Sequence, residues 1–108
     1  MSTGNRWVRL EDGVGLALDS RRGDRVIVRV DRDRALMERI AAAGPWRYRP
    51  QDRVVVNRVG LLLRRLVTGA RGPYTAVRQA DPLDCRRASL AVVSRAAVAL
   101  DTHRRLRA

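Results

Sequence analysis

The sequence predicts an α+β fold in which an N-terminal three-stranded antiparallel meander is followed by three helices. Between 6 and 30, apolar residues alternate with polar ones, as in half-buried strands. After 30, apolar residues recur at helical spacing between capping residues and Gly or Pro stops. A chain of 108 residues has room for one hydrophobic core, because pieces below about 50 residues are only marginally stable. We therefore expect a single domain that spans 1–108.

The three strands are expected from runs of apolar residues with a period of two: Val8 and Leu10; Val14, Leu16 and Leu18; Val26, Val28 and Val30. A three-residue loop with Gly13 in the left-handed region would pair Leu10 with Val14, and we prefer this register. A two-residue turn at 12–13 would place Leu10 opposite Gly15 and mix the faces. The preferred register leaves a second, open face with Trp7, Arg9, Arg25, Ile27 and Arg29, a further candidate contact surface.

The first helix is predicted over 32–43. Asp31 or Asp33 is a suitable N-cap, because its carboxylate can accept from the first free backbone N–H groups. The Gly44–Pro45 pair then ends the helix.

The second helix is predicted from Asp52, as its N-cap, to about Thr68, with Gly69 after its last turn. The run Val54–Val56 supports an alternative, because β-branched residues favour extended backbone. In this alternative a short fourth strand lies near 53–57 and the helix begins near Arg58.

The last helix is predicted over 81–102, with Asp81 as N-cap and Pro82 at the first helical position. Its apolar stripe is broader than a surface helix needs. The helix is therefore either central to the core or pairs with a second copy of the chain, which would make a homo-oligomer.

The net charge is the main functional signal. The chain has 23 basic residues, all arginine, against 11 acidic ones, for a formal charge of +12. Codon bias explains arginine in place of lysine but not the imbalance, and so high a charge is self-repulsive without an anionic partner. The net charge is +2 in 1–45, +7 in 46–80 and +3 in 81–108. The middle segment holds the candidate phosphate-binding residues Arg47, Arg49, Arg53, Arg58, Arg64, Arg65, Arg71 and Arg78.

Trp46 and Tyr48 alternate with arginines in the same segment. On extended backbone the two aromatic rings would point to one side and Arg47 and Arg49 to the other. Bases could then stack on one side while phosphates bind on the other. The alternative is that Trp46 fills the core next to the helix stop, with Tyr48 beside it.

The residues of catalytic and metal sites do not occur at suitable spacings. Cys85 is the single cysteine, and the single histidine, His103, lies 18 residues beyond it on the predicted helix. That separation is about 27 Å along a helix, so the two cannot share a site. We expect no enzyme activity, no cofactor and no metal site. The start of the sequence lacks an apolar signal-peptide core, and no apolar run is long enough for membrane insertion. A reducing cytoplasmic location is expected.

These observations favour a small nucleic-acid-binding protein that contacts the phosphate backbone, of DNA or RNA, through an arginine-rich surface centred on 46–78. The alternative is a non-catalytic subunit, adaptor or inhibitor that docks on an acidic protein surface.

Overall fold

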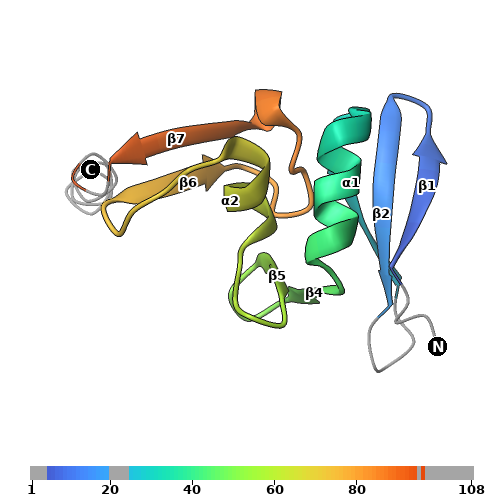
Figure 1. Ribbon diagram of the computed structural model, residues 1–108, viewed down its shortest axis with the longest axis horizontal. Helices are drawn as coiled ribbons and strands as arrows, with labels where there is room; N and C mark the ends of the chain where they lie inside the picture. The colour runs from blue at the N-terminus through green and yellow to red at the C-terminus, as the bar shows by residue number, and fades with distance from the viewer. Residues whose placement is uncertain (1–4, 20–24, 95, 97–108) are drawn as a thin grey trace.

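The computed structural model describes residues 5–19, 25–94 and 96. Its elements are, in order, β1 (Arg6–Leu10), β2 (Gly13–Asp19), β3 (Arg25–Val30), α1 (Arg34–Ala43), β4 (Trp46–Arg49), β5 (Val54–Asn57), α2 (Leu63–Thr68), β6 (Thr75–Gln79), the 3-10 turn η1 (Arg87–Ser89) and β7 (Leu90–Ser94). The β1–β3 meander lies at one end and the β6–β7 hairpin at the other, with α1 between them (Figure 1).

The predicted succession of three helices after the meander is wrong. Over the described residues the fold is mostly β, with seven strands in three small antiparallel sheets. Only α1, of ten residues, is a helix of several turns, since α2 has six residues and η1 three.

The meander itself is confirmed, with strand order β1-β2-β3, but its predicted register is wrong. Leu10 lies opposite Gly13 and Trp7 opposite Leu16, so the turn consists of Glu11 and Asp12 alone. This register puts Trp7 on the core side of the sheet. On the outer side the missing side chain of Gly15 leaves room for its neighbours, since a Cβ there would lie 2.6 Å from Ile27.

The first helix is confirmed within two residues of its predicted start. Asp33 is the N-cap, and its carboxylate accepts a hydrogen bond of 3.1 Å from the backbone N–H of Leu36. Leu36 and Ile40, one turn apart, form the buried face of the helix.

The second predicted helix is wrong over its first half, where the alternative with a short fourth strand is confirmed. The three valines belong to β5, which pairs with β4. The helix start near Arg58 in that alternative is wrong, since α2 begins at Leu63. Asn57 first closes a turn, in which its side-chain amide oxygen accepts from the backbone N–H groups of Val59 and Leu61. Gly69, at φ 73°, ends α2 as predicted.

The predicted helix over 81–102 is wrong for residues 81–94. Asp81 caps a turn instead, since its carboxylate accepts from Leu83 N–H at 2.9 Å. Asp84 bonds locally to Arg86 and Ser89, and the β-branched pair Val92–Val93 lies in β7. Over 81–94 there is therefore no helix through which two copies could pair. Residues 95 and 97–102 of the predicted helix lie outside the described residues.

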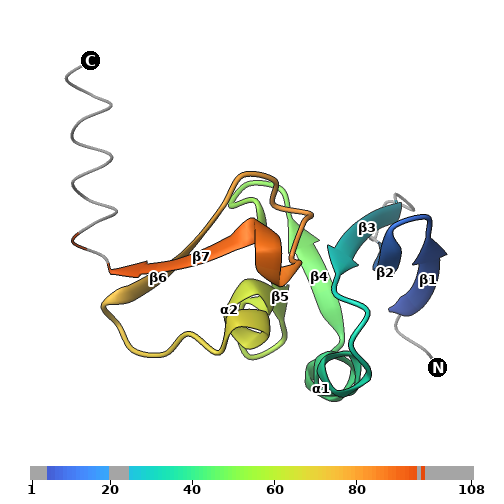
Figure 2. The same cartoon turned by 90° about the horizontal axis from the view of Figure 1, so that it is seen from above.

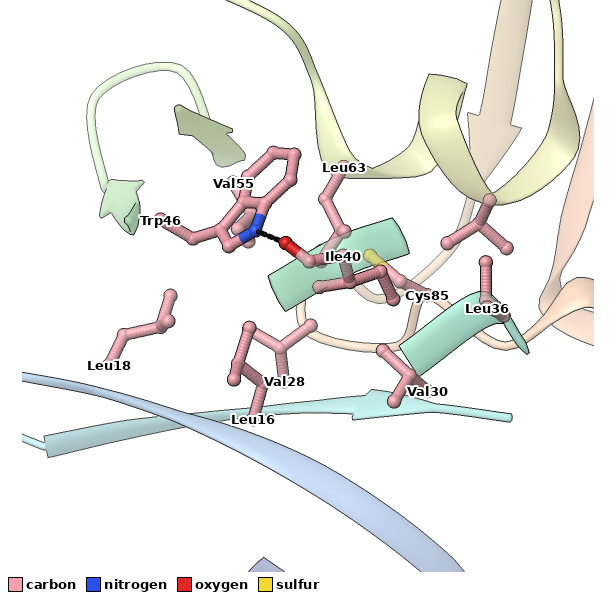
Figure 3. Close-up of a cluster of buried hydrophobic side chains, with 11 residues drawn as sticks. Leu16, Leu18, Val28, Val30, Leu36, Ile40, Trp46, Val55, Leu63 and Cys85 are labelled. Atoms are coloured by element: carbon pink, nitrogen blue, oxygen red, sulfur yellow. Dashed lines mark hydrogen bonds between the residues drawn. The ribbon is translucent and has the colours of Figure 1, made fainter. Parts of the chain in front are cut away.

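The core lies between the meander and the second half of the chain (Figure 3). Leu16, Leu18, Val28 and Val30 of the sheet pack with Leu36, Ile40, Trp46, Val55, Leu63, Val67 and Cys85. The segment 83–85 returns to the meander and runs parallel to β3. Arg29 donates its N–H to Leu83, and Cys85 donates its N–H to Arg29, both at 2.8 Å. These two bonds fix the β6–β7 connection against the sheet.

Candidate nucleic-acid interface

Acidic side chains gather where the 83–89 segment meets the meander. Arg86 makes a bidentate pair with Asp84, at 2.9 Å from Nε and 2.8 Å from Nη2, and a further contact of 3.3 Å with Asp12. Asp12 also contacts Arg29 at 3.3 Å. Ser89 donates its hydroxyl to Asp84 at 2.7 Å. These donors hold the pKa of Asp84 well below its usual range, with the Arg86 bonds contributing most.

Two more aspartates, Asp31 and Asp33, contact Arg87 of the same segment. Asp33 contacts the Arg87 guanidinium at 3.1 Å, and Asp31 accepts from the Arg87 backbone N–H at 2.8 Å. The Leu36 and Arg87 bonds lower the pKa of Asp33. The positive charge of 86 and 87 is therefore matched by carboxylates close by.

The segment 46–80 has a different electrostatic character. Asp52, its only acidic residue, forms an ion pair with Arg49 in the β4–β5 turn. The side chains of Arg47, Arg53, Arg58 and Arg71 are exposed, and within the described part of the chain none of them forms an ion pair. Arg78 is also exposed, on β6. The first four arginines, on β4, two turns and the α2–β6 loop, thus lack a carboxylate partner among the described residues.

Arg64 is one of two predicted contact arginines that point inward. Arg64 donates from Nη1 to the Gln79 amide oxygen at 3.4 Å, and its Nε is buried without a described hydrogen-bond partner. Burial lowers the pKa of this guanidinium. Gln79 also contacts the Cys85 sulfur at 3.9 Å, and burial raises the pKa of that thiol to about 11. Arg64 thus covers the edge of the core, and Cys85 is an inert core residue.

Arg65 ties down the loop between α2 and β6. Its guanidinium donates to the carbonyl oxygen of Gly72 at 3.4 Å and to that of Thr75. The Thr75 hydroxyl in turn donates to Arg71 O and, at 3.1 Å, to Gly72 O. Arg65 is therefore a structural residue that gives the loop a fixed shape.

Trp46 belongs to the core, as the alternative interpretation of the sequence proposed. Its side chain is only 4% exposed, and its indole N–H donates to Ile40 O at 2.7 Å, the dashed bond in Figure 3. Tyr48 is partly buried against the same cluster. The backbone is extended, as expected for the alternating pattern, but the aromatic side of β4 faces the protein, so Trp46 offers no platform for a base.

The exposed aromatic residue of 46–80 is Tyr74, which is not among the predicted contact residues. Tyr74, in the α2–β6 loop, is 77% exposed and follows the Gly72–Pro73 turn. Its position after a turn in the most basic segment was a usable signal, because a ring next to Pro in a loop has few neighbours to cover it. Val59, in the turn after Arg58, is 87% exposed.

The predicted second contact face of the meander is divided between its two sides. Arg25 and Arg29 lie on the outer side, where they contact Asp19 and Asp12, each at 3.3 Å. Trp7 and Arg9 lie on the core side and line a shallow hollow of about 610 Å³ against α1. No single face therefore presents this set.

The described residues contain no group of three His, Cys, Asp or Glu side chains placed to hold a metal ion. His103 lies outside the described ranges. No helix between 5 and 94, with 20–24 left out, combines the length and apolar character that crossing a bilayer needs.

The chain matches no known protein-family model, no curated protein and no solved structure.

Proposed function

We propose that the protein binds nucleic acid by contacting the phosphate backbone through the exposed arginines of 46–78. Arg47, Arg53, Arg58 and Arg71 are the main contacts, and Arg78, which is also exposed, is a further candidate. The observation that carries the proposal is the exposure of these four arginines, without ion pairs to other described residues, in a segment whose one carboxylate is already paired. A cytoplasmic location belongs to the same proposal.

The distribution of charge supports a phosphate partner. Arginine presents a planar fork of donors that matches two phosphate oxygens, and each neutralised phosphate releases condensed counterions. The partner thus gains affinity from every arginine that is free to contact it. Arginines that already pair with carboxylates, such as Arg86 with Asp84, add less affinity, because a phosphate contact would replace an existing ion pair.

The contacts proposed here are to the backbone and not to base edges. The positions lie on short strands, turns and a loop, and the one helix of this half has only six residues. Recognition by inserting a helix into the major groove therefore lacks a suitable element in 46–78. Binding of this kind has little sequence preference and a strong dependence on salt.

The test is fluorescence anisotropy with single-stranded and duplex oligonucleotides over about 50 to 150 mM salt, where non-specific binders register. A variant with Arg47, Arg53, Arg58 and Arg71 changed to alanine is expected to reduce the slope of log K against log salt by about three units. The matched control changes Arg6, Arg32, Arg34 and Arg39 to alanine, four exposed arginines outside the segment with the same loss of charge.

The proposal requires the two variants to differ. Equal losses of affinity would mean that net charge and not this surface determines binding. No binding by the unmodified protein would overturn the proposal and direct the search to an acidic protein partner.

A further inference from the structure

We infer that the loop 70–74 is a binding site for an unpaired base, with the Tyr74 ring as its stacking platform, so that the preferred ligand is single-stranded nucleic acid. This inference rests on the proposed function and specifies its substrate class. Its evidence is independent of the charge count, because it comes from the exposure of one ring and from the bonds that fix the loop around it.

Tyr74 is exposed far beyond what the fold requires. Of the four large apolar or aromatic side chains exposed among the described residues, Tyr74 is the only aromatic one. A tyrosine usually keeps its ring against the protein and only its hydroxyl in water. Here 77% of the residue is accessible, so both the ring and its hydroxyl are available to a ligand.

The backbone that carries the ring is held in place. Arg65 bonds to the carbonyl oxygens of Gly72 and Thr75, on either side of the 73–74 pair. Thr75, the first residue of β6, closes the loop. Its hydroxyl and its backbone N–H both donate to Gly72 O, the N–H at 3.5 Å. A ring on a fixed loop loses less conformational entropy on binding than one on a free tail, which favours a recognition role.

The electrostatic surroundings fit a nucleotide. Arg71, three residues before Tyr74, is exposed and forms no ion pair with another described residue. No acidic residue occurs between 53 and 80. In Figure 2 the α2–β6 connection, drawn in yellow, lies at the periphery, away from the meander with its carboxylates. A base stacked on Tyr74 would thus place its phosphate in a cationic region.

The same geometry distinguishes single strands from duplexes. In a duplex the bases are already stacked and paired, so a ring on a surface loop reaches only the backbone. An unpaired base has a free face, and stacking on an aromatic side chain is tolerant of base identity. Tyr74 should therefore add affinity for single strands of any sequence and none for duplexes.

The experiment compares Tyr74→Ala and Tyr74→Phe in anisotropy titrations with a single-stranded DNA, an RNA of the same sequence and the corresponding DNA duplex. Tyr74→Ala is expected to weaken single-strand binding about tenfold or more, since stacking of one base contributes a factor of that order. Its salt slope should stay unchanged, because no phosphate contact is removed. Tyr74→Phe should retain most of the affinity, and duplex binding should change less than twofold. A larger effect on one single strand than on the other identifies it as the preferred ligand.

Val59→Ala is the matched control, because Val59 is 87% exposed, against 77% for Tyr74, but has no ring. Salt-dependent binding by the unmodified protein together with unaltered single-strand affinity of Tyr74→Ala would overturn this inference and leave the proposed function intact. Equal losses for single strand and duplex would also overturn it. Absence of binding by the unmodified protein would instead overturn the proposed function.

Discussion

At the residue scale, arginine has two distinct uses in this protein. Arg64 and Arg65 point inward and bond to Gln79 and to loop carbonyls, so they stabilise the fold. Arg47 and Arg58 are exposed and available to a partner. The difference arises because α2 packs against β6, whereas Arg47 on β4 and Arg58 in the turn after β5 face solvent. An arginine side chain can serve both uses, since its aliphatic part packs against apolar groups while its guanidinium donates hydrogen bonds.

Asp84 should make the stability of the protein sensitive to acid. Its side chain is only 14% exposed and accepts from Arg86 and Ser89, which holds its pKa below the usual value of about 3.9. A carboxyl whose pKa is lower in the folded than in the unfolded state stabilises the fold above the unfolded pKa, and the contribution is lost as the pH falls through the folded pKa. The free energy of unfolding should therefore fall from about pH 5 towards pH 2.

Asp84→Asn should lower the free energy of unfolding at pH 7 by about 1 to 3 kcal/mol and flatten this acid dependence. Urea denaturation followed by circular dichroism at several pH values measures both effects. Asp19→Asn, in the exposed pair with Arg25, is the control and should change stability by less than about 1 kcal/mol. An acid dependence that Asp84→Asn leaves as steep would show that other carboxyls cause it.

At the scale of elements, one buried asparagine organises the middle of the chain. Asn57, at the end of β5, is 6% exposed and donates to Ala43 O at the end of α1, at 2.9 Å. Its amide oxygen accepts from Val59 N–H at 3.2 Å and Leu61 N–H at 2.8 Å. The side chain thus joins α1, β5 and the turn that leads to α2, and it fixes the position of Arg58 at the surface.

Asn57→Ala should lower the free energy of unfolding by about 2 to 4 kcal/mol, because it leaves three backbone groups without their partner. Gln51→Ala, an exposed polar residue of the β4–β5 turn, should stay within about 0.5 kcal/mol. Chemical denaturation of both variants tests this. Equal stabilities would mean that water replaces the Asn57 bonds at no cost.

At the scale of the whole molecule, the charge is divided between two halves. Carboxylates and arginines alternate around the meander and the 83–89 segment, whereas the half formed by β4–β6 has one carboxylate for eight arginines. The two halves share one core, to which the meander and Cys85 contribute from one half and Trp46, Val55, Leu63 and Val67 from the other. A bound polyanion would reduce the repulsion between the arginines of the β4–β6 half.

An oligonucleotide should therefore raise the melting temperature of the protein. A ligand at one hundred times its Kd stabilises the folded state by about 2.7 kcal/mol, which corresponds to a rise of about 10 °C or more for a chain of this size. Differential scanning fluorimetry should show this rise for the unmodified protein and for the variant at Arg6, Arg32, Arg34 and Arg39. The variant at Arg47, Arg53, Arg58 and Arg71 should show little of it, and an equal rise would exclude the proposed surface.

An element could be predicted where the residues that determine it are close to one another in the sequence. The α1 helix was predictable because its cap, Asp33, and its stop at Gly44–Pro45 act within the helix itself. The 81–102 helix was wrong over 81–94 because the same kind of signal, Asp81 before Pro82, also suits a capped turn. Pairing of β7 with β6 then decided between the two, and that partner is distant in sequence.

The candidate site divides in the same way. The distribution of charged residues along the sequence was enough to find the excess charge in 46–80 and the arginines proposed as contacts. It could not tell that Arg49 pairs with Asp52, that Arg64 and Arg65 bond inward, or that Tyr74 and not Trp46 is the exposed ring. Each of these depends on which groups the fold brings within a few ångströms of one another.

By itself the sequence determined the meander, the first helix and the segment in which basic charge exceeds acidic charge, because periodicity, caps and composition are properties of neighbouring residues. The tertiary structure alone decided the strand register, the strands in place of helices and the direction of each side chain in the basic segment. These depend on packing and hydrogen bonds between segments far apart in the chain, and such contacts outweigh local propensities that differ by about 1 kcal/mol per residue or less.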